Sequence, residues 1–217
     1  DADHLTGLRQ VLKRYEIGKI YYSNVNDETA GYTDFKNTIS EKNISAVVPK
    51  IGENFAPFSS AIFTFLWPGD QFDGKDAESI NNTSEVAKFC YFNHCALFTG
   101  DIEIDEQGTM FNYYSSRQTE GAAEKSDNSQ SSTSNNDIFS SELLKIPHHG
   151  SNNGTDQNLL NIVQPKHAVI EVGVDNKYGH PHAPVIDLLQ KNNIQYFRTD
   201  LNGTIEFVFS QSRIIKK

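Results

Sequence analysis

Residues 143–151, LLKIPHHGS, are the stretch on which the fold and the chemistry of this chain depend. A short apolar run ends at Pro147, and two histidines follow before Gly150, which is typical of a buried strand that runs into a loop. In α/β sheets, ligands bind at the carboxyl ends of the strands, and imidazole is the commonest metal ligand. For His148 and His149 alone, an ordinary loop is the better interpretation. Whether they belong to a metal site therefore depends on the other polar clusters of the chain.

Composition narrows the class of protein. The 217 residues suffice for one large domain or two small ones. A net charge of −9 argues against a passive binder of nucleic acid. It leaves open a metal-dependent enzyme that acts on phosphates, because bound cations supply local positive charge. We expect no membrane-spanning segment, no signal peptide and, with only two cysteines, no disulfide framework or thiolate zinc cluster.

The chain begins with DADH at residues 1–4, directly before a predicted helix whose apolar face carries Leu5, Leu8, Val11 and Leu12. One interpretation is a cluster that caps this helix. The other is half of a metal site, since two carboxylates and an imidazole within four residues can hold divalent ions. A domain that starts at its own ligand loop is unusual, so we expect upstream residues to be missing.

Strand patterns dominate the first half of the sequence, with a predicted helix at 32–41. The predicted strands are residues 17–24, 44–48, 61–67, 86–92 and 95–98, the last two forming a hairpin. Cys90 and Cys95 fall in its two arms and are expected to be small buried residues, a disulfide being the alternative. The next residues, LFTGD, place Asp101 at a strand end.

The second half alternates strands and helices. The largest apolar side chain in residues 115–136 is alanine. Such a segment buries too little apolar surface to fold, so it predicts a disordered surface insertion. Predicted helices at 156–163 and 184–191 and predicted strands at 167–173, 195–198 and 203–209 follow. A second histidine loop, NKYGHPH at 176–182, follows one of these strands. The pattern indicates a layered α/β domain with one functional edge.

Taken together, DADH, FTGD, LLKIPHHGS and NKYGHPH, followed by FRTDLNGTI, resemble the metallo-β-lactamase fold. The sequence is most similar to the domain attached to ComEC-type DNA-uptake (competence) proteins and to its stand-alone relatives. The resemblance runs from residue 1 to residue 209. It implies one α/β domain over residues 1–217, an αββα sandwich that is N-terminally truncated here.

The resemblance also implies a site for one or two divalent ions, zinc or manganese. The metal ligands that it implies are Asp1, Asp3, His4, Asp101 as the bridging carboxylate, and His148. Asn81 and Ser84 match an Asn-x-x-Ser pattern that stands where the classical fold has a further histidine. Oxygen-rich ligation shifts the preference from Zn²⁺ toward Mn²⁺ or Mg²⁺.

The predicted activity is metal-assisted phosphodiester hydrolysis in nucleic acid, a nuclease reaction. Asp3 would orient or deprotonate the attacking water, and His149 or His180 would donate a proton to the leaving oxygen. The predicted substrate contacts are Asn81, Ser84, Ser151 and Lys145. A hydrolase of lactones, thioesters or phosphocholine esters and a non-catalytic DNA- or protein-binding domain remain alternatives. A ComEC-like parent would join the domain to a membrane channel outside the cytoplasm, whereas a stand-alone form could be cytoplasmic; oligomeric state stays open.

Overall fold

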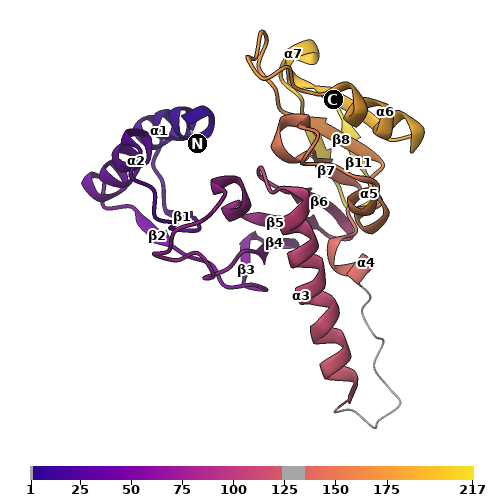
Figure 1. Cartoon of the computed structure of the whole chain (residues 1–217), viewed down its shortest axis with the longest axis horizontal. Helices are drawn as coiled ribbons and strands as arrows, with labels where there is room; N and C mark the ends of the chain where they lie inside the picture. Colours follow the sequence, from indigo (N-terminus) through magenta and orange to yellow (C-terminus); the bar gives the residue numbers. More distant parts are fainter. Residues whose placement is uncertain (1, 124–134) are drawn as a thin grey trace.

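A seven-stranded mixed sheet with the order β3-β4-β5-β6-β7-β8-β9 forms the centre of the molecule. The computed structural model describes residues 2–123 and 135–217. Two small sheets, β1-β2 and β10-β11, lie outside the main one. Figure 1 shows the N-terminal helices on one side of the molecule and the helices of the C-terminal half on the other. The predicted α/β class is confirmed.

The first half of the sheet is antiparallel. β3 (Asn54–Phe58), β4 (Ala61–Trp67), β5 (Val86–Tyr91) and β6 (His94–Phe98) follow one another in sequence and in space. Between β4 and β5 lies a short 3-10 helix, η1 (Ile80–Thr83). Cys90 and Cys95 are paired across the β5-β6 hairpin and form a disulfide. The expectation of two separate buried thiols is therefore wrong, because both residues face the same side of neighbouring strands and are only partly buried.

The second half of the sheet is parallel, with β7 (Leu143–Lys145), β8 (His167–Ile170) and β9 (Gln195–Arg198) added to β6 in register. The crossovers are α3 (Ile104–Ala123) with α4 (Asn135–Phe139), then α5 (Gln157–Val163), then α6 (Ala183–Lys191). Four neighbouring strands thus end at the same edge. The segments that follow them are residues 99–103, 146–151, 171–182 and 199–202, and ligand sites of α/β sheets occur at this edge.

The main core lies between the sheet and the crossover helices. Val86, Leu97 and Leu144 of the sheet pack in one cluster with Met110 of α3 and Leu189 of α6, all at 0–1% exposure. Burial of this apolar surface holds the crossovers on the sheet and so fixes where each strand ends.

The N-terminal segment has a small core of its own. α1 (Ala2–Arg14) packs on α2 (Ala30–Glu41), with Leu5, Leu12 and Tyr32 among its buried residues. A parallel pair, β1 (Lys19–Tyr21) and β2 (Ser45–Val47), accompanies the helices. The helix begins at Ala2, earlier than predicted, so residues 3 and 4 lie in its first turn rather than before it.

The chain ends with α7 (Thr199–Asn202) and an antiparallel pair, β10 (Phe207–Phe209) and β11 (Ile214–Lys216). None of the helices in the described ranges is both long and apolar enough to cross a membrane.

The predicted insertion at 115–136 needs a correction at its start. Residues 115–123 continue α3, whose second half extends away from the rest of the molecule in Figure 1. The helix is anchored by its first half, where Met110 and Phe111 are buried. Residues 124–134 lie outside the described residues, so for them the prediction stays a prediction.

Candidate metal centre

Asp101 follows the end of β6 and is fixed by its neighbours. Gly100 has a φ of +54°, and a Cβ on it would lie 2.6 Å from the Cβ of Ser84, so this position requires glycine. The backbone N–H of Asp101 donates a hydrogen bond to Ser84 Oγ at 2.9 Å. Only 5% of Asp101 is exposed. A carboxylate is therefore held in place at the edge where the parallel strands end.

The histidine loop after β7 has an unusual backbone. Pro147–Gly150 forms a short 3-10 segment, η2, in which His148 and His149 both adopt left-handed conformations, with φ of 48° and 54°. Left-handed φ is uncommon for residues other than glycine, and such residues cluster at functional sites. The backbone N–H of His148 donates to Gly100 O at 3.2 Å, which ties this loop to the one carrying Asp101.

Three side chains converge at this edge: His4 from α1, Asp101 and His149. Nε2 of His4 lies 2.6 Å from Asp101 Oδ2, and Nε2 of His149 lies 3.4 Å from the same oxygen. The two imidazole nitrogens are 3.2 Å apart. All three potential ligand atoms lie within 4.8 Å of one another, so one divalent ion could contact them together.

The ring of His149 is also oriented by a hydrogen bond from its second nitrogen. Its Nδ1 lies 2.6 Å from the backbone carbonyl oxygen of Glu171. A carbonyl only accepts, so Nδ1 carries a proton. Nε2 donates to Asp101 when the ring is protonated, and in the neutral ring it offers the lone pair that a metal ion needs. Histidine ligands in metal sites have this arrangement, in which the second ring nitrogen donates to a carbonyl or carboxylate. We call His4, Asp101 and His149 the ligand trio.

The charges around the trio favour an ionised carboxylate. Burial alone would raise the pKa of Asp101, but hydrogen bonds from His149 and His4 and the charge of Lys145 hold it well below its usual range. The hydrogen bond to Asp101 raises the pKa of His149. Oδ1 of Asp101 is buried and has no hydrogen-bond partner among the described residues. Oδ1 of Asp101 is thus without a hydrogen-bond partner in the described part of the chain, while Oδ2 faces the imidazoles of His4 and His149.

Lys145, predicted as a substrate contact, points its ammonium group toward Gly100 and Asp101. Its ammonium group donates to the carbonyl of Gly100 at 3.0 Å and lies 3.9 Å from Asp101 Oδ1, and the side chain is only 11% exposed. Burial lowers its pKa, and the nearby carboxylates of Asp101 and Glu171 act in the opposite direction. Its geometry suits fixing the charge of Asp101, and its contact with a substrate stays a prediction.

His148 points to a different set of residues. Its Nδ1 lies 3.8 Å from Glu103 Oε1, which also accepts a hydrogen bond from Asn81 Nδ2 at 3.0 Å. His180, from the second histidine loop, contacts both neighbours, with ring centroids 5.7 Å from His148 and 6.4 Å from His149. The structure thus brings His148, Asn81 and His180 beside the trio, whose third member is His149. The predicted role of His148 as a ligand stays a prediction.

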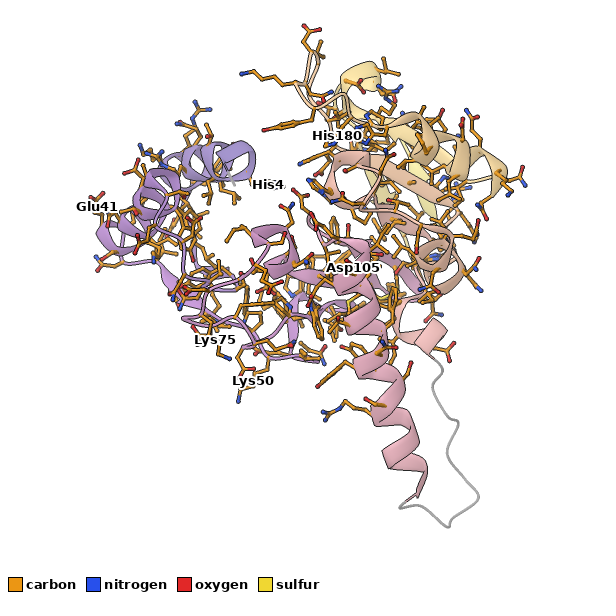
Figure 2. The ribbon with its side chains drawn as sticks, viewed as in Figure 1. His4, Glu41, Lys50, Lys75, Asp105 and His180 are labelled. Carbon is orange, nitrogen blue, oxygen red and sulfur yellow. A yellow bond between two sulfur atoms is a disulfide. The ribbon has the colours of Figure 1, made fainter. Side chains whose placement is uncertain are left out.

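The other predicted residues are placed as follows. Ser84 supports the backbone of Asp101, and Ser151 is buried, its N–H donating to His148 O at 2.8 Å. Asp3 belongs to the first turn of α1, and nothing is described of its side chain; Asp1 lies outside the described residues. Figure 2 labels His4 on the N-terminal helices and His180 on the C-terminal half that faces them, so the site joins the two sides of the molecule.

Two carboxylates near the trio were missed from sequence. Glu103 lies two residues after Asp101, and Glu171 directly follows β8, so strand-end position was the signal that could have indicated both. Cavities flank the trio on both sides. One of about 330 Å³ is lined by His4 and Asp101, and one of about 490 Å³ is lined by His149, Glu171 and His180.

The chain was compared with protein-family models, with curated proteins and with solved structures. No protein-family model matches the chain. It is 30% identical over 135 residues to ComE operon protein 3 of Bacillus subtilis, covering 62% of this chain and 15% of that protein. It is 26% identical over 146 residues to Competence protein ComA of Neisseria gonorrhoeae, covering 65% and 18%. It is 23% identical over 219 residues to Recombination protein 2 of Haemophilus influenzae, covering 99% and 22%.

The chain therefore spans less than a quarter of the length of these curated relatives. Among solved structures, it is similar to a Parabacteroides distasonis protein described as "Putative metal-dependent hydrolase", with a TM-score of 0.43 and 10% identity over 87% of this chain and 79% of that one. A likeness at this level does not establish a shared fold.

Proposed function

We propose that this chain is a metal-dependent phosphodiesterase domain of the metallo-β-lactamase type that acts on DNA. The observation that carries the proposal is the orientation of His149, whose Nδ1 is bound to Glu171 O while Nε2 meets His4 and Asp101. One of the relatives is named as a competence protein and another as a recombination protein, which supports DNA as the substrate.

In this proposal the ligand trio holds a divalent ion, zinc or manganese, and Asp101 Oδ1 is free to contact a second one. A bound divalent ion lowers the pKa of water and neutralises charge on phosphoryl oxygens. Lys145 keeps Asp101 ionised and in position, and the carbonyl of Glu171 keeps His149 in the tautomer that binds metal. Asp3 stays our candidate for orienting the attacking water.

The proton to the leaving oxygen comes from the neighbouring histidines. Burial and the neighbouring imidazoles of His182, His148 and His149 lower the pKa of His180, so its neutral form prevails at pH 7. A neutral imidazole still donates one hydrogen bond to a phosphoryl oxygen. The proposed proton donors are His149 and His180, and His148, whose Nδ1 lies 3.8 Å from Glu103 Oε1, is a third candidate by position.

The setting of the domain is part of the proposal. The relatives are several times longer than this chain, so we propose that it is one part of a DNA-uptake protein with a membrane channel. The Cys90–Cys95 disulfide supports a place outside the cytoplasm, because disulfides persist in oxidising compartments.

The test combines metal content with cleavage. The chain is loaded with Mn²⁺, Mg²⁺ or Zn²⁺, its metal content is measured by elemental analysis, and cleavage of single- and double-stranded DNA is followed on gels. We expect stoichiometric metal and cleavage, with Asp101→Asn losing both. The matched control is Asp105→Asn, an exposed carboxylate in the first turn of α3, which should behave as the wild type. Metal binding without cleavage of any DNA, or full cleavage by Asp101→Asn, would overturn the proposal.

A further inference from the structure

The cavity that borders His4 and Asp101 has features that the ligand trio does not use. Its volume is about 330 Å³, and it opens between α1, the segment after β1, and the start of β5. Pockets of this size and above bind small ligands or parts of larger ones. His4 and Asp101 of the ligand trio also line this cavity. A group bound in the cavity could therefore belong to the same ligand molecule as a phosphate at the metal.

Glu85 is the polar group that needs a partner in this cavity. Both of its carboxyl oxygens are buried, and neither has a hydrogen-bond partner among the described residues. Burial raises its pKa to about 8, so the neutral acid, with one donor and one acceptor, prevails at pH 7. An unpaired buried polar group costs free energy that a ligand with matching groups recovers. The hydroxyl of Tyr32 is likewise buried without a partner within the described part of the chain.

The walls of the cavity are flat and apolar. Tyr21, Tyr22 and Tyr32 contribute aromatic rings, and the aliphatic lining residues are Leu5, Leu8, Val25 and Ile80. Its lining, as far as the structure describes it, contains no lysine or arginine, while Glu85 and Asp27 are acidic. A phosphate or carboxylate would be unpaired there, and a purely apolar group would leave Glu85 unpaired.

We propose that this cavity binds a nucleobase of the nucleotide whose phosphate lies at the ligand trio, with Glu85 pairing to a donor–acceptor edge of the base. A nucleobase is planar, stacks on aromatic side chains and offers adjacent N–H and acceptor groups on its edges. The unpaired hydroxyl of Tyr32 supplies a further polar contact. This inference rests on the proposed function, because it assumes that the phosphate of the same nucleotide is at the metal.

The experiment compares two substrates that differ only in the base. One is the p-nitrophenyl ester of thymidine 5′-phosphate, and the other is the same ester on a tetrahydrofuran sugar that carries no base. We expect the metal-loaded chain to prefer the first in kcat/KM by about tenfold or more, since stacking of one base contributes about 1–3 kcal/mol. Glu85→Leu should lower this preference at least about fivefold, whereas Glu85→Gln, which keeps a donor and an acceptor, should retain most of it.

Glu28→Leu is the matched control, because it makes the same change at an exposed carboxylate that is not among the lining residues, and its preference should equal that of the wild type. Equal kcat/KM for both esters, or an unchanged preference in Glu85→Leu, would overturn the inference and leave the phosphodiesterase proposal standing. If neither ester is cleaved, the DNA-cleavage test above decides the proposed function, and binding is measured directly by calorimetry with free thymidine and the base-free sugar. Thymidine binding that Glu85→Leu weakens supports the cavity assignment, and absence of thymidine binding contradicts it.

Discussion

Nε2 of His149 lies 3.2 Å from Nε2 of His4, although the two residues are 145 positions apart in the chain. The Nδ1 proton of His149 is committed to Glu171 O, so its Nε2 is an acceptor in the neutral ring. Two imidazole nitrogens at this distance need a proton or a metal ion between them, and Asp101 adds a negative charge at the same point. Among the residues that the structure describes, this relationship indicates a cation site.

The first prediction concerns which histidine binds the metal. His149→Ala removes a member of the ligand trio and should weaken metal affinity by about 100-fold or more, since even supporting residues of metal sites cost 10–100-fold. His148→Ala should weaken it by about tenfold at most, because His148 lies beside Glu103 and outside the trio. Calorimetric titration with Zn²⁺ and Mn²⁺ measures both. An equal or larger loss in His148→Ala would return the ligand position to His148.

The second prediction concerns the contact between the two histidine loops. Gly150 has a φ of +82°, and a Cβ there would lie 2.6 Å from Cβ of Pro181, which follows His180. Gly150→Ala should therefore lower the free energy of unfolding by at least about 2 kcal/mol, from left-handed strain and overpacking together. It should also weaken metal binding, because the contact sets the position of the histidine loop.

Gly108 provides the control for this substitution. It lies in α3, and a Cβ on it would meet nothing within 4 Å. Gly108→Ala should be neutral or stabilise the protein by about 1 kcal/mol, the helix-propensity difference between the two residues. Urea denaturation of both variants measures the contrast, and equal stabilities would show that the loop tolerates a side chain at residue 150.

The third prediction concerns the disulfide. Cys90 and Cys95 are cross-strand neighbours in the β5-β6 hairpin, five residues apart in sequence. The chain-entropy model gives about 2 kcal/mol for so short a loop. Reductant should lower the urea midpoint of the wild type accordingly, and it should leave the Cys90→Ser/Cys95→Ser double variant unchanged. A midpoint that does not respond to reductant in either protein would contradict this.

Much of the site's framework could be predicted from sequence because strand ends are local signals. Apolar runs followed by Gly-Asp or by Pro-His-His place Asp101 and the histidine pair at one edge of the sheet. That His149 turns its Nε2 toward His4 and Asp101 could not be predicted, since this orientation depends on two left-handed backbone conformations and on the carbonyl of Glu171. The hydrogen bond from His149 to the carbonyl of Glu171, 22 positions away, cannot be recognised in the PHHG sequence itself.

The helix α3 shows a second limit of sequence reasoning. Its glycines, serines and threonines have low helix propensity, and the core contacts that the structure describes for it include those of Met110, Phe111 and Tyr114. Polar residues of the second half therefore matched the composition of a disordered segment. Glu85 shows a third limit, because a glutamate at the start of a strand predicts exposure. Glu85 borders a cavity that residues of α1 and α2, far from it in sequence, also line.

The last prediction follows from the raised pKa of Glu85, which burial shifts from 4.5 to about 8. Between these two pH values the folded state holds a proton that the unfolded state has lost. Stability therefore falls as pH rises through this window, by up to about 1.4 kcal/mol per pH unit from this group. Glu85→Gln cannot ionise, so its stability relative to the wild type should increase steadily from pH 5 to pH 8.

Urea denaturation at pH 5, 6.5 and 8 measures this difference. Other titrating groups, including Asp101 and His149, contribute nearly equally to both proteins and cancel in the difference. Glu28→Gln, an exposed position, should give a curve parallel to that of the wild type. Parallel curves for Glu85→Gln as well would mean that the Glu85 carboxyl finds solvent or a partner in solution, and the case for a base-binding group in the cavity would lose its main support.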